Sequence, residues 1–297
     1  MTEVLRIAPE VQQALHDGRA VVALETTLVA HGFPPGVGVE VGQAAEAAVR
    51  SEGAVAATVG VLDGEVVVGL DATELERFGE AGADARKAGP RDLAACVASG
   101  ELGATTVGGT LAAARLAGIR FMGTGGIGGV HRGFADRPDV SADLAQLART
   151  PALVVSSGIK SLLDVPATAE LLETLGVPVL GYRTTELPLF YSAGGGPPVS
   201  SRVDDPAQAA RTAQAHWQLG GAALLLARDP DDGVDVEPLV QEALAAAATQ
   251  GIYGQGVTPF VLSFLHERSE GRTLEVNREL IVANARLAAQ VAIAATD

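Results

Sequence analysis

Short apolar runs of strand type alternate along most of this chain with alanine-rich stretches of helical period. This alternation constrains the fold more than any other feature, because strands joined through helices pair in parallel and lie under those helices. The predicted strands are 21–24, 55–61, 66–70, 105–107, 120–123, 153–156, 177–181 and 222–226. The predicted helices between them are 40–52, 72–79, 91–100, 110–117, 141–149, 166–176 and 206–219.

The whole chain, residues 1–297, is predicted to form one α/β domain with a mainly parallel, helix-covered sheet. No long linker, fixed-period repeat or sharp change of composition divides it. The glycine- and proline-rich stretch 192–201 is predicted to be a loop. Three further helices, 239–250, 259–268 and 274–295, are expected to pack over the sheet or to mediate oligomer contacts.

The acidic composition excludes several classes of partner. A formal net charge of −15 repels nucleic acid and anionic membrane surfaces, so an anionic substrate must be held by local groups. No apolar run reaches the length of a membrane span, and Met1 to Glu10 lacks the apolar stretch of a secretory signal. The single cysteine, Cys96, fits a reducing compartment. We therefore expect a cytoplasmic protein with no membrane or nucleic-acid partner.

Lysine is rare in this chain, which makes its two lysines informative. Of 21 basic residues only Lys87 and Lys160 are lysine. Arginine stays protonated, whereas a desolvated lysine can lose its proton and attack a carbonyl carbon. Lys160 ends the apolar run 152–160, so we expect it at the carboxyl edge of a buried strand, where open α/β sheets bind ligands. A lysine that merely extends into solvent from a strand end is the alternative.

Two other segments carry groups of chemical interest. Glu25 closes the first long strand, where a carboxyl group can act as a general acid or simply cap a turn. The stretch 123–133 is rich in glycine and ends near His131 and Arg132, which indicates either a cradle for an anion or only a tight strand-to-helix turn.

Three aspartates follow this glycine-rich stretch. Asp136, Asp139 and Asp143 lie close together in sequence. They could supply oxygen ligands to Mg²⁺ or Mn²⁺, ions that keep several waters and need only one or two protein oxygens. Equally, Asp139 or Ser141 could cap the helix that follows.

Taken together, these segments resemble the pseudouridine-5′-phosphate glycosidase family, also called indigoidine synthase A-like. The resemblance extends almost from end to end, over ordered blocks rather than one motif. The blocks are 22–28 with His31-Gly32, Lys87 before 91–93, 103–107, 124–133, 139–144, 157–161, 176–182, 258–260, and Asn277 with Asn284.

The resemblance implies a three-layer α/β/α sandwich around a mixed sheet, a homotrimer, and a reaction assisted by Mn²⁺. The implied activity is reversible cleavage of the carbon–carbon glycosidic bond of pseudouridine 5′-phosphate to uracil and ribose 5-phosphate, a step of nucleotide catabolism. By similarity Lys160 is the imine-forming nucleophile, Glu25 the proton donor and Asp139 the metal ligand. The implied substrate contacts are Lys87, Val107, Ser141, Ala142, Asp143, Thr124, His131 and Asn284.

Two other functions use the same residue types. A Schiff-base aldolase acting on a phosphorylated sugar would need the same lysine and the same anion cradle. A non-catalytic sugar-phosphate sensor would use both lysines only to pair with phosphate. The sequence also departs from the family pattern, because 33–38 lacks the usual asparagine and Ala283 replaces the first asparagine of a pair.

Overall fold

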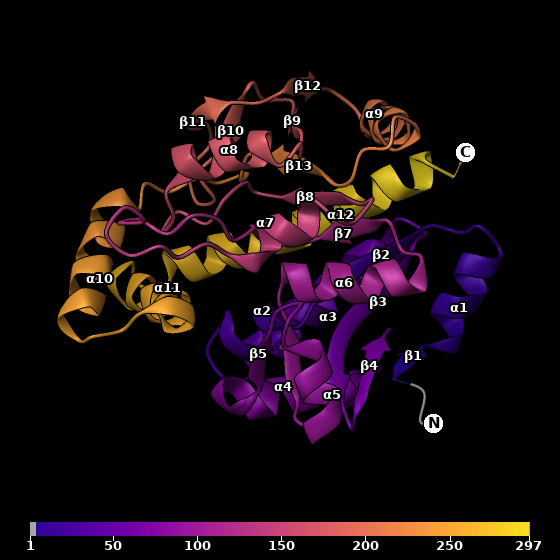
Figure 1. Ribbon diagram of the computed structural model, residues 1–297, viewed down its shortest axis with the longest axis horizontal. Coiled ribbons are helices and arrows are strands. Elements are labelled where there is room, and N and C mark those ends of the chain that lie inside the picture. Colours follow the sequence, from indigo (N-terminus) through magenta and orange to yellow (C-terminus); the bar gives the residue numbers. More distant parts are fainter. Residues whose placement is uncertain (1–3, 297) are drawn as a thin grey trace.

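The computed structural model describes residues 4–296, and its main feature is one sheet that runs through the molecule (Figure 1). The strand order is β1-β4-β3-β2-β7-β8-β13-β9-β12, with β5 and β6 attached to β3. All pairs are parallel except β3 with β4 and β3 with β6, so the predicted mixed, mainly parallel sheet is confirmed. The strands are β1 (Leu5–Ile7), β2 (Val21–Glu25), β3 (Val55–Leu62), β4 (Glu65–Val68), β5 (Arg86–Ala88), β6 (Gly103–Thr105), β7 (Phe121–Gly123), β8 (Leu153–Ser156), β9 (Val179–Tyr182), β12 (Ser201–Val203) and β13 (Leu224–Arg228).

Helices cover both faces of this sheet, which gives the expected α/β/α sandwich (Figure 1). The helices are α1 (Pro9–His16), α2 (Thr27–His31), α3 (Val37–Ser51), α4 (Ala72–Ala81), α5 (Leu93–Ser99), α6 (Val107–Ala117), α7 (Ala142–Leu147), α8 (Val165–Thr174), α9 (Pro206–Gln218), α10 (Glu237–Thr249), α11 (Val257–Arg268) and α12 (Arg272–Ala294). Every predicted helix is present near its predicted bounds. Within residues 4–296, no helix combines the length and apolarity needed to cross a membrane.

Residue alternation along β2 explains how the two faces differ. Leu24 is paired with Thr58 on β3 and with Gly123 on β7, so these three positions share one face. A Cβ atom at Gly123 would lie 2.9 Å from the Cα of Ala285, because α12 lies directly on this part of the sheet. Glu25, the next residue of β2, therefore points to the opposite face, where α6 packs.

Strand β3 is longer than its neighbours and creates a branch in the sheet. Its first half pairs with β2 as far as Glu25 opposite Val59, and its second half pairs with β6 at Gly60 and Val61. Strand β5 then pairs with β6. Because β6 runs antiparallel to β3 and β5 runs parallel to β6, the carboxyl ends of β5 and β6 approach the carboxyl end of β2.

Several short elements were not predicted. They are β1, α1, α2, β5, β12 and a separate antiparallel pair, β10 (Glu186–Pro188) with β11 (Gly195–Pro198). The prediction of a loop over 192–201 is wrong for β11, since residues 195–198 pair with β10. These segments are too short to show a clear hydrophobic period.

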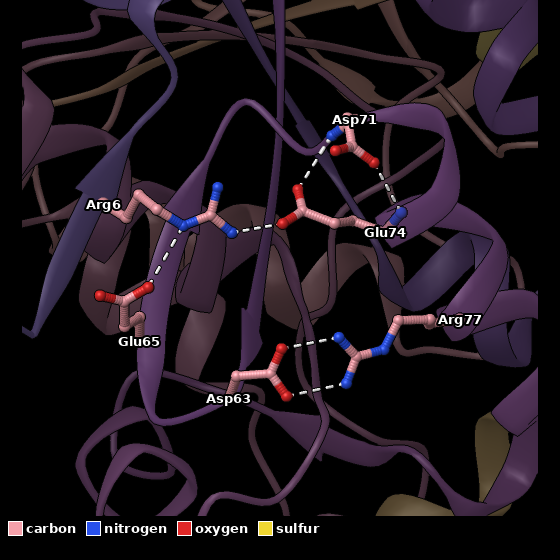
Figure 2. A network of polar contacts seen from close by, with 6 residues as sticks. All are labelled: Arg6, Asp63, Glu65, Asp71, Glu74 and Arg77. Atoms are coloured by element: carbon pink, nitrogen blue, oxygen red, sulfur yellow. Dashed lines mark hydrogen bonds and ion pairs between the residues drawn. The ribbon is translucent and has the colours of Figure 1, made fainter.

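A polar network fixes the edge strand β1 to the rest of the sheet (Figure 2). Arg6 of β1 donates to Glu65 at the start of β4, at 3.2 Å, and to Glu74 of α4. Glu74 also forms a capping box with Asp71 at the start of α4. One guanidinium therefore joins β1, β4 and α4.

Candidate active site

The site lies at the carboxyl ends of three adjacent parallel strands, β2, β7 and β8. Glu25 is the last residue of β2, Thr124 directly follows β7, and Lys160 lies in the turn after β8. The Thr124 hydroxyl donates a hydrogen bond to Oε1 of Glu25. Parallel strands end at the same sheet edge, so residues far apart in sequence meet here as expected.

The Glu25 side chain is almost completely buried, with 4% of its surface exposed. Burial raises the pKa of the Glu25 carboxyl, because it removes water from the charged form. The nearby Lys160 ammonium and the Thr124 hydrogen bond act in the opposite direction and lower this pKa in part. A carboxyl group in such surroundings is suited to donate a proton near neutral pH.

The turn that carries Lys160 is held tightly between two loops. Gly158 has φ of +80°, and a Cβ there would lie 2.1 Å from the carbonyl oxygen of Pro188. Lys160 N donates to Ile127 O at 3.3 Å, and Ile127 N donates to Gly158 O at 3.1 Å. Only glycine permits both the left-handed backbone and this close approach. Gly158 therefore determines the path of the backbone that leads to Lys160.

Lys87 reaches the same site from β5, through the branch in the sheet. Burial lowers the pKa of its ammonium group, and the neighbouring Lys160 acts in the same direction. Asp143, Glu25 and Asp139 oppose that effect. The two lysines of the chain therefore lie in one mixed-charge site.

Two connected cavities meet at these residues. The first, the polar cavity, has a volume of about 230 Å³ and a lining that is about equally polar and apolar. The second, the apolar cavity, is a smaller space of about 50 Å³ with a mostly apolar lining. Both are lined by Glu25, Thr27, Lys87, Lys160 and Thr258. The proton donor and nucleophile implied by the family resemblance therefore lie at the junction of a polar and an apolar compartment.

The polar cavity contains most of the expected substrate contacts. Its lining includes Val107, His131, Asp139, Ser141, Ala142 and Asp143. Asp143 is buried and accepts backbone hydrogen bonds from Gly108, at 2.8 Å, and Gly128, at 2.9 Å. Its carboxylate therefore joins the start of α6 to the glycine-rich loop, besides bordering the cavity.

The apolar cavity is lined by several residues for which no role was predicted. Its walls include Leu28, Phe190, Pro259, Leu262 and Ile281. Leu28 belongs to α2, a helix too short to be predicted, and Phe190 lies beside the β10–β11 pair. Sequence reasoning missed these residues because an apolar wall residue looks the same as a core residue until the chain is folded.

Two polar groups also border the apolar cavity. Asn277, on α12, is 4% exposed. His31 Nε2 donates to the carbonyl of Ala85 at 2.9 Å, which leaves Nδ1 as an acceptor that has no partner in the described part of the chain. Burial lowers the pKa of His31 and favours this neutral form.

Thr124 and Asn284, two expected contacts, lie in different surroundings. Thr124 borders the apolar cavity. Asn284 is completely buried outside the linings of both cavities, and its amide donates to the carbonyls of Thr124, at 2.8 Å, and Gly125, at 3.3 Å. Asn284 therefore supports the glycine-rich loop from behind, while Asn277 of the same helix borders the cavity.

Arg132, next to His131 in sequence, has different surroundings. It lies outside the linings of both cavities and binds Glu237. Of these two neighbouring residues, only His131 borders the polar cavity.

The expected metal ligand, Asp139, lines the polar cavity beside His131. The His131 Nδ1 to Asp139 Oδ2 distance is 4.0 Å, and the Asp139 carboxylate accepts no hydrogen bond from the described residues. Residues 4–296 contain no group of three or more His, Cys, Asp or Glu side chains arranged to hold a metal. The geometry thus fits a hard cation that keeps most of its waters, but not a closed protein cage.

The profile of the indigoidine synthase A-like proteins matches residues 10–294 of this chain. The chain belongs to the indigoidine synthase A-like family. A pseudouridine-5′-phosphate glycosidase of Herpetosiphon aurantiacus is 49% identical over 99% of this chain and 98% of its own length. Another, from Paracoccus denitrificans, is 46% identical over 99% of both chains.

Solved structures of this family share the fold. The prealnumycin C-glycosynthase AlnA, in complex with ribulose 5-phosphate, has a TM-score of 0.90 and 42% identity, covering 100% of this chain and 98% of its own. An indigoidine synthase A-like protein from Thermotoga maritima has a TM-score of 0.90 and 34% identity, covering 99% and 97%. Ala283 replaces the first asparagine of the pair that the resemblance led us to expect. It lies outside the linings of both cavities, on a part of α12 that borders a separate surface pocket.

Proposed function

We propose that this chain is a pseudouridine-5′-phosphate glycosidase, which converts pseudouridine 5′-phosphate and water into uracil and ribose 5-phosphate. The observation that carries the proposal is the placement of Glu25 and Lys160 at the junction of a polar and an apolar cavity. Full-length relatives with 46% and 49% identity have this name, and the structurally similar glycosynthase binds a pentose phosphate.

The proposed reaction begins at the ribose ring. Protonated Glu25 gives its proton to the ring oxygen, and the ring opens as the uracil becomes conjugated with C1′. The nitrogen lone pair of the Lys160 amine then adds to C1′. The proton that the nitrogen loses after this addition passes to the uracil carbon, and the carbon–carbon bond breaks, which releases uracil and leaves a lysine imine. Water hydrolyses the imine to ribose 5-phosphate, which restores the amine and returns a proton to Glu25.

The polar cavity would hold the sugar phosphate. Lys87, His131 and the Ser141–Asp143 segment line it, and the Lys87 ammonium supplies local attraction to an anion in a chain of net charge −15. Binding energy from the phosphate, which does not react, would orient the reacting end of the substrate.

The apolar cavity would hold the uracil ring. Phe190 and Ile281 provide apolar contact, the Asn277 amide borders the cavity, and His31 Nδ1 has no partner among the described residues. An amide offers both donors and an acceptor, and Nδ1 offers an acceptor, so they match the carbonyl and N–H groups of uracil. Pairing with the base would satisfy polar groups that are costly to leave unpaired.

We further propose that Asp139 holds a Mn²⁺ ion at the phosphate end of the polar cavity. A single free carboxylate suits an ion of this type, which retains several waters. When bound, the ion would neutralise negative charge on the phosphate. A homotrimer, which rests on the family resemblance, and a cytoplasmic location, which rests on the single cysteine, complete the proposal. Light scattering coupled to size exclusion tests the trimer.

The decisive experiment is incubation of the purified protein with pseudouridine 5′-phosphate and Mn²⁺, followed by chromatography with mass detection. The expected products are uracil and ribose 5-phosphate in equal amounts, with much slower turnover of unphosphorylated pseudouridine. Lys160→Ala is the control for contaminating activity. Cleavage of a phosphorylated sugar between its own carbons would instead favour the aldolase, and tight binding without turnover would favour the sensor.

A further inference from the structure

The Arg132 guanidinium forms hydrogen bonds with three residues, although it borders neither cavity. Its two terminal nitrogens donate to the two carboxylate oxygens of Glu237, at 2.7 and 2.9 Å. One of these nitrogens, Nη2, also donates to the carbonyl of Ser161 at 2.7 Å, and Nε donates to the carbonyl of Leu163 at 3.2 Å. The pair is part-exposed, with side-chain exposures of 28% for Arg132 and 53% for Glu237.

The two carbonyls belong to the turn that carries Lys160. Leu163 N donates back to the carbonyl of Lys160 at 3.0 Å, so Lys160 to Leu163 form one turn. Asp164 N donates to Val130 O at 2.9 Å, which joins this turn to the glycine-rich loop. The Arg132 side chain joins the same two segments through its hydrogen bonds to the carbonyls of Ser161 and Leu163. Rotation of the turn would break both of these hydrogen bonds.

Glu237 connects this junction to a third element. It is the first residue of α10, and α10 packs against α11. Helix α11 supplies Thr258, which borders both cavities. The Arg132 guanidinium, at the end of the glycine-rich loop, therefore contacts both the Lys160 turn and α10. Helix α10 in turn packs against α11, which borders the site.

We propose that Arg132 is a positioning residue, held in orientation by Glu237, that fixes the Lys160 turn so that the amine faces the junction of the two cavities. The inference rests on the proposed role of Lys160 as nucleophile. A planar guanidinium can bind a carboxylate with two parallel hydrogen bonds and still donate to two carbonyls, which a single ammonium cannot do in the same geometry.

The test compares Arg132→Ala, Arg132→Lys and Glu237→Gln with Arg77→Ala as a matched control. Arg77 forms an equivalent two-bond pair with Asp63, at 2.7 and 2.9 Å, that lies outside both cavity linings (Figure 2). Because misplacing a reacting group by about 1 Å can cost about 100-fold in rate, Arg132→Ala should lower kcat by about 10- to 100-fold with KM changed less than about 3-fold. Arg132→Lys should recover only part of this loss, Glu237→Gln should cause a smaller loss, and Arg77→Ala should change neither constant.

Hydrogen–deuterium exchange of the peptide that covers residues 157–165 gives a readout independent of the reaction. It should be faster in Arg132→Ala than in the wild type, and unchanged in Arg77→Ala. The proposal would be overturned by any of three results. They are unchanged exchange in Arg132→Ala, an unchanged kcat in both Arg132→Ala and Arg132→Lys, or a rise in KM without a fall in kcat. If the wild type releases no uracil, the proposed function fails, and the exchange measurement alone decides whether Arg132 holds the turn.

Discussion

The hydroxyl of Thr124 donates a hydrogen bond to the buried carboxyl of Glu25, at the ends of neighbouring strands β7 and β2. A donor of this kind favours the ionised carboxylate, whereas burial favours the neutral acid. Burial is the larger effect, so the pKa of Glu25 is raised, but Thr124 limits the rise. The pair thus sets the pH range in which Glu25 can act as an acid.

Replacing Thr124 by valine should therefore move the loss of activity at high pH to a still higher pH. Without the hydroxyl, the pKa of Glu25 rises further and the acid stays protonated longer. The measurement is kcat against pH. Thr58→Val is the control, because Thr58 donates similarly to Glu46 away from both cavities. A shift toward lower pH in Thr124→Val would contradict the assignment of Glu25 as proton donor.

Glu25→Gln should abolish turnover but stabilise the protein at neutral and alkaline pH. The pKa of Glu25 is raised in the folded state above its ordinary value of 4.5. Its ionisation therefore costs folding free energy as pH rises through the folded-state pKa, and costs nothing below about pH 4. Calorimetry should show a higher Tm for Glu25→Gln than for the wild type at pH 8 and no difference at pH 4. Equal Tm values at pH 8 would count against a raised pKa.

Substitutions of the two lysines should affect different kinetic constants. Lys160→Arg keeps the charge but cannot form an imine, so kcat should fall by about 1,000-fold or more. Lys87→Gln should mainly raise KM, by about 10- to 100-fold, as expected for loss of a charge-assisted hydrogen bond of about 1.5–3 kcal/mol. Borohydride added with ribose 5-phosphate should label Lys160 in the wild type and in Lys87→Gln. Labelling of Lys87 instead would reverse the assignments.

Asp143→Asn should destabilise the protein as well as weaken substrate binding. Both carboxylate oxygens accept backbone N–H groups, and an asparagine would turn an NH₂ group toward one of them. Leaving one buried donor unpaired costs about 1–3 kcal/mol in urea unfolding. Asp205→Asn is the control, since Asp205 accepts a single N–H, from Gln208, at a helix N-terminus. Equal stability of the two variants would show that Asp143 acts only through the substrate.

Asp139→Asn should raise the Mn²⁺ concentration that gives half-maximal activity by about 10-fold or more, because an amide is a weaker ligand than a carboxylate. Asp136→Asn is the matched control, since Asp136 is an exposed carboxylate outside the cavity linings. A similar metal response in both variants would place the ion elsewhere.

The sequence by itself determined the longer helices and strands and the edge of the sheet where the site lies. Strand and helix periods are local properties, so long elements such as β3 and α12 were predicted near their observed bounds. Glu25 and Lys160 follow buried strands, and parallel strands place such residues at one edge whatever their separation in sequence. Their place at one edge therefore followed from the sequence, whereas the neighbouring positions of β2, β7 and β8 in the sheet bring them together.

Only the tertiary structure decided which other residues reach that edge. Lys87 arrives through the branch at β3, because β6 pairs with β3 beyond the end of β2. Asn277 and Asn284 lie on one face of α12 but about 10 Å apart along its axis. The packing of α12 on β7 and β8 places Asn277 at the cavity and Asn284 behind the loop. Such differences depend on contacts between distant segments, which no local pattern encodes.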